Sequence, residues 1–337
     1  MSFDDPINTT TQPEEEDLFI SLRAKAWDEF FGQETVKESL LIAIHAAKER
    51  KEPLDHILLY GPPGLGKTTL SHLISQELGS SLKITSGTAM TKVGDLAAIL
   101  TNLQPNDVLF IDEVHRLPKA IEETLYPAME DYALDIVIGK GPSARTLRLD
   151  LPKFTIVAAT TRFGLLAGPF RDRFGLVHKL HFYSPESLAI IIDKAATKLK
   201  IEINDECTLE LARRARGTPR IALKLLKRVR DFVQVQGRSK IVIEDVRAAL
   251  DMIAIDTMGL EDSDRKLLEH IIKKHNGGPV GLSTLAATLS EDSLTVEEVI
   301  EPYLMQIGFL KRTPKGRVVT KSAYDHLGQV YPDTHSA

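Results

Sequence analysis

One segment of the sequence combines glycines, a lysine and a threonine at a spacing that binds phosphate groups. Residues 61–68 read Gly-Pro-Pro-Gly-Leu-Gly-Lys-Thr, which matches the pattern G-x-x-x-x-G-K-S/T. Glycines allow backbone N–H groups to turn toward phosphate oxygens, and the following helix start adds positive potential. Lys67 is expected to contact the β- and γ-phosphates, and the Thr68 hydroxyl to ligate Mg²⁺. Because residues 57–60 are strand-like and residues 69–78 helical, the sequence predicts a nucleoside triphosphate site.

Two carboxylates follow a second apolar run, about forty residues after this loop. Residues 108–111 read as a buried strand, and Asp112 and Glu113 come directly after it. In a nucleotide-hydrolysing site, Asp112 would hold the Mg²⁺ shell and Glu113 would polarise the attacking water. A third apolar run, 155–160, ends in hydroxyl side chains. Thr161 is placed there either to contact the γ-phosphate or the lytic water, or to form an ordinary turn at the strand end.

Two segments with arginines that could contact a phosphate follow. Arg171 and Arg173 flank Asp172 and can form surface ion pairs of little energy, or present a cation to a phosphate. An arginine delivered by a neighbouring subunit stabilises transition-state charge and is worth ~10³–10⁵ in rate. Arg220 follows Pro219 in the first turn of a predicted helix, where a cation is unfavourable. That mismatch suggests a bound anion near Arg220.

The composition excludes several classes of protein. The 337 residues are 43% hydrophobic and 26% charged, which is typical of a soluble globular chain. The net charge of -5 means that any DNA contact needs a local basic patch. A single cysteine, Cys207, excludes an intrachain disulfide and fits a reducing compartment. Without a signal peptide or an apolar run of membrane-spanning length, we expect a cytoplasmic protein with no membrane contact.

The order of the predicted elements indicates an α/β domain followed by helical domains. Apolar strands alternate with helices up to about residue 183, which predicts a parallel sheet covered on both faces. Helices alone follow, and then three helices with two short strands, the order of a DNA-binding winged helix. We therefore expect a polar, acidic tail at 1–20, an ATPase domain at 21–183, an all-helical lid domain at 184–255 and a winged-helix domain at 256–337.

Residues 134–151 have the pattern of a β-hairpin inserted in the ATPase domain. Leu134, Ile136 and Ile138 alternate with other residues before a Gly/Pro break, and the alternation resumes after it. A hairpin alone is barely stable in water, so its apolar face needs a partner. Packing on its own domain and docking to another protein are both compatible with this pattern.

The region 305–323 carries five basic residues and no acidic one. The step from Pro314 to Gly316 is typical of the turn between two wing strands. We expect Arg312 and Arg317 to contact DNA phosphates, while a merely solvated hairpin is the alternative.

Taken in order, these motifs resemble those of the AAA+ ATPases, and more closely those of the RuvB family of Holliday-junction branch-migration motors. The likeness covers about residues 20–330, and the stretch 125–151 is not shared by AAA+ proteins in general. The matching stretches are 22–23, 32–33, 61–69, 109–117, 125–151, 159–162, 171–175, 213–221 and 301–317.

The resemblance implies an ATP- and Mg²⁺-dependent DNA helicase that forms a homohexameric ring on double-stranded DNA at Holliday junctions. It implies RuvA as a partner bound through Ile136 and Ile138, RuvC in a resolving complex, and a role in recombination, repair and the SOS response to DNA damage. The implied catalytic residues are Asp112, Glu113, Thr161 as sensor 1, Arg220 as sensor 2 and Arg173 as an arginine finger acting in trans. The implied nucleotide-binding residues are Leu22, Arg23, Gly64, Gly66, Lys67, Thr68, Thr69, Glu130, Asp131, Tyr132, Arg173, Tyr183 and Arg220, with Thr68 and Asp112 also holding the metal.

Two other functions compete with this interpretation. A protein-remodelling AAA+ ATPase would have an aromatic pore loop and a substrate-binding N-terminal domain, and the sequence has neither pattern. A nucleotide switch or clamp-type scaffold would not need Glu113 or Arg173. One departure from the family concerns DNA: Ser293 stands where some members carry a DNA-facing arginine.

Overall fold

The computed structural model describes residues 20–138 and 145–332, so the expected acidic tail lies almost wholly outside the described residues. The chain divides into two compact units. The first comprises residues 1–187 with 218–220, and the second comprises residues 188–217 with 221–337. Among the described helices, none combines the length and the apolar character needed to cross a membrane.

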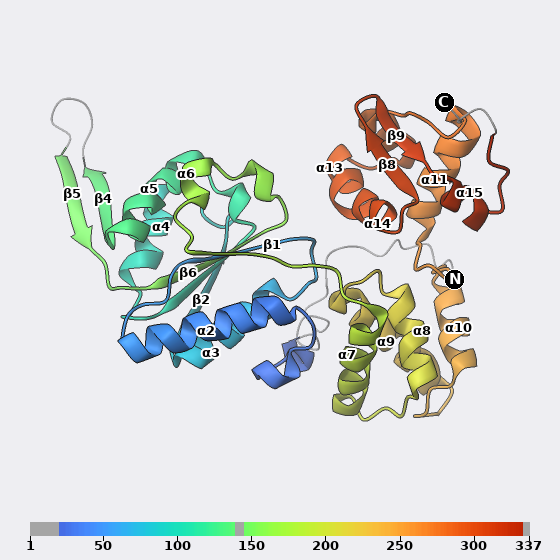
Figure 1. The fold of residues 1–337 in the computed structure, drawn as a ribbon, viewed down its shortest axis with the longest axis horizontal. Coiled ribbons are helices and arrows are strands. Elements are labelled where there is room, and N and C mark those ends of the chain that lie inside the picture. Colours follow the sequence, from blue (N-terminus) through green and yellow to red (C-terminus); the bar gives the residue numbers. More distant parts are fainter. Residues whose placement is uncertain (1–19, 139–144, 333–337) are drawn as a thin grey trace. The chain divides into compact units, whose positions relative to one another are not determined.

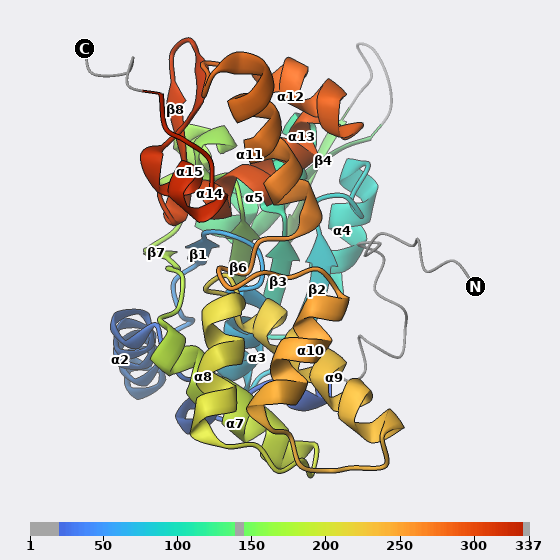
Figure 2. The same ribbon diagram turned by 90° about the vertical axis from the view of Figure 1, so that its right-hand side faces the viewer.

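The first unit is built on a five-stranded parallel sheet (Figure 1). Figure 2 shows its strands side by side, and the order across the sheet is β2 (Leu82–Ser86), β3 (Val108–Asp112), β6 (Thr155–Thr160), β1 (Ile57–Tyr60) and β7 (Leu176–Lys179). The predicted parallel sheet is confirmed. Strand β7 was not predicted, because as an edge strand it alternates exposed and half-buried residues and lacks an apolar run.

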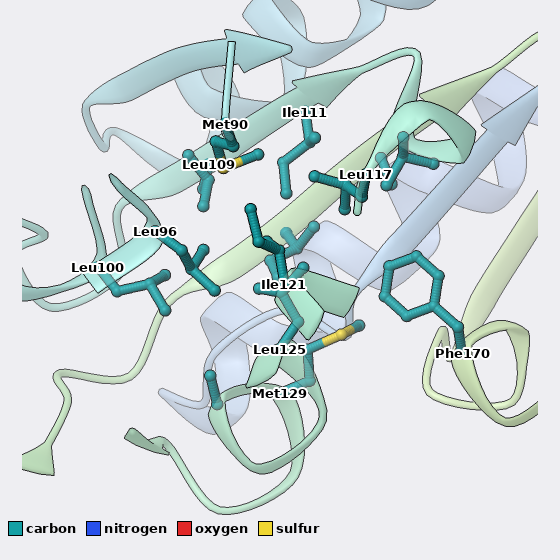
Figure 3. Packing of buried hydrophobic residues seen from close by; sticks show 14 of the residues in the cluster. Met90, Leu96, Leu100, Leu109, Ile111, Leu117, Ile121, Leu125, Met129 and Phe170 are labelled. Carbon is teal, nitrogen blue, oxygen red and sulfur yellow. The ribbon is translucent and has the colours of Figure 1, made fainter. Parts of the chain in front are cut away.

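Helices cover both faces of this sheet. Figure 1 shows α2 (Glu34–Arg50) and α3 (Lys67–Leu78) on one face, and α4 (Val93–Thr101) and α5 (Lys119–Glu130) on the other. All six residues of β6 are buried, as expected for a central strand covered on both sides. Figure 3 shows the core between the sheet, α4 and α5, where Met90, Leu96, Leu100, Leu109, Ile111, Leu117, Ile121, Leu125, Met129 and Phe170 pack together.

The parallel arrangement gives the sheet two chemically different edges. The carboxyl ends of β1, β3 and β6 meet at one edge, where Tyr60 pairs with Thr160. The end of α5 lies at the opposite edge. There His56, the residue before β1, accepts a hydrogen bond from the backbone N–H of Ile156 (2.9 Å) and donates one from Nε2 to the carbonyl of Met129 (3.1 Å). His56 is therefore a satisfied core histidine that fixes the end of α5 to the starts of β1 and β6.

A hairpin follows α5 and extends away from the sheet (Figure 1). Strands β4 (Ala133–Ile138) and β5 (Arg145–Asp150) pair antiparallel, with Ile136 opposite Leu147. Leu134 is buried and Leu149 packs against the domain core, whereas Leu147 is 45% exposed. Residues 139–144 and the side chains of Ile136 and Ile138 lie outside the described residues. The base of the hairpin thus packs on its own domain, while its outer part presents an apolar side chain to solvent.

The second unit begins with the helices expected for a lid. These are α7 (Pro185–Lys198), whose first turn belongs to the first unit, α8 (Asp205–Arg214), α9 (Pro219–Val235), which starts at the 218–220 segment, and α10 (Ile243–Met252). Asn204 caps α8 by accepting a hydrogen bond from the backbone N–H of Cys207 (2.9 Å). Cys207 itself is buried, as expected for a packing residue.

The rest of this unit is a winged helix with its own apolar core. Its elements are α11 (Asp262–His275), α12 (Leu282–Leu289), α13 (Ser293–Thr295), a π-helical turn (Val296–Ile300), α14 (Glu301–Gln306), β8 (Leu310–Thr313), β9 (Gly316–Val319) and α15 (Lys321–His326). The third helix of the winged helix begins at Ser293, where Asp292 caps it by accepting a hydrogen bond from the backbone N–H of Thr295 (2.8 Å).

Candidate functional site

The phosphate loop connects β1 to α3, and its lysine bonds back to the start of the loop. Lys67 is the first residue of α3, and its buried Nζ donates to the carbonyls of Gly61 and Pro62, both at 2.8 Å. Burial lowers the pKa of Lys67, while the nearby charges of Asp112 and Glu113 raise it. An ammonium group held over backbone carbonyls in this way is positioned to exchange them for phosphate oxygens.

Asp112 ends β3 at the same edge of the sheet. Burial raises the pKa of its carboxyl group, and the charge of Glu113 adds to this rise. The backbone N–H of Glu113 donates to Asp112 Oδ1 at 2.9 Å and opposes the rise, as do the charges of Lys67 and Arg220. The pKa of Asp112 is raised overall, because the effect of burial is larger than that of the cationic neighbours. Mg²⁺ prefers oxygen ligands, so Asp112 and the hydroxyl of Thr68 fit this metal.

The conformation of Glu113 is unusual for a residue with a side chain. Its φ is 46°, in the left-handed region, which costs of order 1–3 kcal/mol and is typical of functional sites. Thr161 Oγ1 donates to Glu113 Oε2 at 3.2 Å, so the predicted sensor threonine does meet the predicted base. His115 Nδ1 lies 3.2 Å from the same carboxylate oxygen and 2.9 Å from Thr160 Oγ1. Sequence reasoning missed His115, although it lies only two residues after Glu113.

Arg220 faces the phosphate loop, as its position in the first turn of α9 suggested. Gly64 has φ +79°, and a Cβ atom there would lie 3.0 Å from Arg220 Cβ, so only glycine allows this approach without displacement. The charge of Arg220 also offsets part of the rise that burial causes in the pKa of Asp112. Arg220 therefore lies beside the phosphate loop and close enough to Asp112 to interact with its carboxylate.

Other predicted nucleotide-binding residues lie around the same loop. The buried hydroxyl of Tyr183 donates to the carbonyl of Leu65 (3.2 Å), and burial raises its pKa. Arg23 NH1 lies 3.5 Å from His72 Nε2 of α3. Tyr183 also lines a pocket together with Gly32, and the lining of this pocket includes no residue of the loop. Gly66, Thr68 and Thr69 are half-buried in the loop and the start of α3, and Leu22, which precedes Arg23, is also half-buried.

Arg173 belongs to a second cluster, at the end of α5. Its NH2 lies 3.0 Å from Glu130 Oε1, its NH1 donates to the carbonyl of Pro169 (2.5 Å), and its guanidinium lies 4.1 Å from the centre of the Tyr126 ring. Its Nε is buried and has no hydrogen-bond partner among the described residues. The arginine is therefore held by its own domain with part of its donor capacity unused.

This second cluster lies at the edge of the sheet opposite the phosphate loop. The strands between the edges have four to six residues, or about 13–20 Å, which exceeds the length of an arginine side chain. Asp131 pairs with Arg148 (3.0 Å), and the Tyr132 ring lies 5.8 Å from Phe154 and 6.4 Å from His56. Hence Glu130, Asp131, Tyr132 and Arg173 are not brought together with Lys67 of their own chain.

The wing arginines have an internal partner that the sequence did not indicate. Arg317 Nε lies 2.6 Å from Glu301 Oε1, and Arg312 NH2 lies 2.7 Å from Glu301 Oε2. Glu301 is fully buried, while the side chains of Arg317 and Arg312 are 12% and 44% exposed. Arg317 thus neutralises a buried carboxylate, and the expectation that Arg312 and Arg317 contact DNA phosphates stays a prediction. Lys311, Arg312 and Lys315 are the exposed basic residues of the wing.

Comparison with known proteins gives the same family across the chain. Residues 22–180 match the Holliday junction DNA helicase RuvB P-loop domain, residues 183–256 the RuvB AAA lid domain, and residues 257–328 the RuvB C-terminal winged helix domain. The structure is similar to Thermotoga maritima RuvB, described as a Holliday junction branch migration motor, with a TM-score of 0.85 and 50% identity over 93% of this chain and 100% of that one. A point mutant of the same Thermotoga protein gives a TM-score of 0.86 at 50% identity, over 92% of this chain and 100% of that chain. The chain therefore belongs to the RuvB family of Holliday-junction DNA helicases.

Proposed function

We propose that the protein uses ATP hydrolysis to move double-stranded DNA through a Holliday junction, as the motor of a RuvA–RuvB type complex. The observation that carries the proposal is the meeting of Lys67, Asp112, Glu113 and Thr161 at one edge of the sheet in a RuvB-family chain. The domain limits 21–183, 184–255 and 256–337 belong to the same proposal, and so does a cytoplasmic location.

Hydrolysis would use the residues at this edge in separate roles. Lys67 would exchange the carbonyls of Gly61 and Pro62 for phosphate oxygens. Thr68 and Asp112 would hold Mg²⁺, which supplies positive charge to the phosphates. Glu113 would take a proton from the attacking water, with Thr161 holding its carboxylate in place.

Arg173 would serve the nucleotide of a neighbouring subunit. Its position at the opposite edge from Lys67 favours action in trans over action on its own ATP, and this requires a ring in which the two edges face each other. A homohexamer, implied by the family, would satisfy this requirement. RuvC as a further partner and a role in repair and the SOS response also follow only from the family likeness.

The direct test combines ATP turnover, with and without duplex DNA, with branch migration of a synthetic four-way junction in the presence of RuvA. We expect DNA to stimulate ATP turnover. We expect branch migration to separate the junction into its two duplex products only with hydrolysable ATP. If the rate of ATP turnover is the same with and without DNA and no branch migration occurs, a protein-remodelling ATPase is favoured instead.

The hairpin prediction can now be tested on a side chain of known exposure. Leu147 pairs with Ile136 across the hairpin, and its side chain is 45% exposed. We expect Leu147→Asp, and the double change of Ile136 and Ile138 to Ser, to abolish RuvA binding and RuvA-dependent migration while leaving basal ATPase unchanged. The measurement is RuvA affinity by fluorescence anisotropy alongside ATP turnover.

The matched control is Leu134→Ser at the buried base of the hairpin, which we expect to lower thermal stability. If Leu147→Asp binds RuvA with parental affinity, or unfolds as Leu134→Ser does, the outer hairpin is not the docking surface.

For DNA, we expect Lys311→Gln with Lys315→Gln to weaken duplex binding for all sequences. The plot of log affinity against log salt should become less steep by about 0.9 for each lost phosphate contact. Arg317→Gln is expected to lower stability instead, because the buried Glu301 carboxylate loses its more buried cation and keeps only Arg312. A salt slope equal to that of the parent protein in the double lysine variant would remove the wing from the DNA interface.

A further inference from the structure

Arg216, the second residue after α8, is buried against the winged-helix part of the second unit. Its NH2 lies 3.1 Å from Asp264 Oδ1 and its NH1 lies 3.5 Å from Glu261 Oε1. Its guanidinium also lies 4.5 Å from the centre of the Tyr303 ring. One lid residue thus contacts two elements of the winged helix, α11 and α14, through charge and through an aromatic face.

Asp264 makes this contact specific to a cation. It is fully buried in the first turn of α11, where its Oδ2 accepts a hydrogen bond from the backbone N–H of Glu261 (2.8 Å). Burial raises the pKa of Asp264 to about 6, with the charge of Glu261 also raising it and Arg216 opposing both. At pH 7.5 the group is therefore a buried carboxylate. Removing the cation from such a carboxylate is strongly unfavourable, so the pair cannot simply open to solvent.

The segment between α10 and α11 is fixed from both sides as well. Arg214 NH1 donates to the carbonyl of Ile255 (3.3 Å), and Arg265 NH2 donates to the carbonyl of Ala254 (2.8 Å). Gly259, at φ +74°, approaches so closely that a Cβ atom there would lie 2.5 Å from the carbonyl oxygen of Arg214. The connection from lid to winged helix is thus packed in place and is not a free linker.

Arg216 is also joined by a very short segment to the nucleotide site. Arg220 lies four residues further on, and only Gly217, Thr218 and Pro219 stand between the two arginines. Arg220 approaches Gly64 of the phosphate loop and influences the pKa of Asp112. Arg216, at one end of this segment, therefore contacts the winged helix, and Arg220, at the other end, approaches the phosphate loop.

We propose that Arg216 is a positioning residue that couples ATP hydrolysis to DNA movement. Its contacts with Asp264 and Tyr303 make the lid and the winged helix move as one body. A displacement of residues 217–220 during the nucleotide cycle is then passed to the DNA-binding domain and is not absorbed by a hinge. This inference rests on the proposed function.

The test compares Arg216→Gln with Arg216→Lys and with the control Arg213→Gln, which removes an exposed arginine from the same helix end. The readout is the number of base pairs migrated per ATP hydrolysed at pH 7.5 on a synthetic junction with RuvA, with DNA-free ATPase and duplex affinity measured in parallel. For Arg216→Gln we expect the ratio to fall at least tenfold, with DNA-free ATPase and duplex affinity within twofold of the parent. Arg216→Lys should be intermediate, because it keeps the charge and loses the second contact, and Arg213→Gln should match the parent.

Tyr303→Leu gives an independent variant if Arg216→Gln does not fold, because it removes the aromatic face and leaves the ion pair, and we expect its ratio to fall as well. The inference is overturned if the folded variants keep the parental ratio, or if ATPase and migration fall together so that the ratio is constant. A parent protein that neither hydrolyses ATP nor moves a junction would instead overturn the proposed function, so the two failures are distinguishable.

Discussion

Replacing Glu113 with glutamine is expected to reduce ATP turnover by about 10²–10⁴-fold while leaving ATP binding intact. Glutamine keeps the length of the side chain and can still accept the hydrogen bond from Thr161 Oγ1, but it cannot take a proton from water. The measurements are steady-state phosphate release and the affinity for a fluorescent ATP analogue, each made in the presence of duplex DNA.

Two further substitutions make this experiment specific. Lys67→Ala should weaken nucleotide binding itself, because the ammonium group that closes the loop is lost. Thr161→Val should keep binding and reduce turnover less than Glu113→Gln, since the base remains but its orientation is freed. Normal turnover in Glu113→Gln would show that the left-handed glutamate is a structural feature and that another group activates the water.

Arg173→Ala is expected to lower turnover by about 10³–10⁵-fold without preventing ring assembly. The reason is the distance across the sheet: Arg173 is held near Glu130 at one edge, and the phosphate loop lies at the other. A subunit lacking Arg173 still offers an intact nucleotide site, whereas a subunit carrying Lys67→Ala still offers its arginine. Mixing the two variants should therefore restore part of the activity, measured as turnover against mixing ratio.

The neighbouring arginine gives the matched control. Arg171 stacks on Phe163, with its guanidinium 5.1 Å from the ring centre, and Arg171→Ala is expected to retain turnover. Turnover of the parent should also rise more steeply than linearly with protein concentration as rings assemble. Absence of rescue at every mixing ratio, with rings present, would exclude an arginine finger in trans.

The sequence by itself determined the features that depend on residues close together in the chain. The phosphate loop, the paired carboxylates at the end of β3 and the proline-started helix bearing Arg220 are local patterns, and the structure places each where its pattern indicated. The same is true of the parallel sheet, because apolar runs of strand length between helices leave few other arrangements. Strand β7 escaped prediction because its burial comes from one neighbour only, β1.

The tertiary structure alone decided which partner each charged group finds. Arg317 is sixteen residues from Glu301, and Arg216 is forty-eight residues from Asp264, so no local pattern could pair them. The position of Arg173 across the sheet from Lys67 likewise depends on where α5 ends. The physical reason is that backbone conformation follows from neighbouring residues, whereas a buried charge takes whichever opposite charge the packing of distant segments brings within reach.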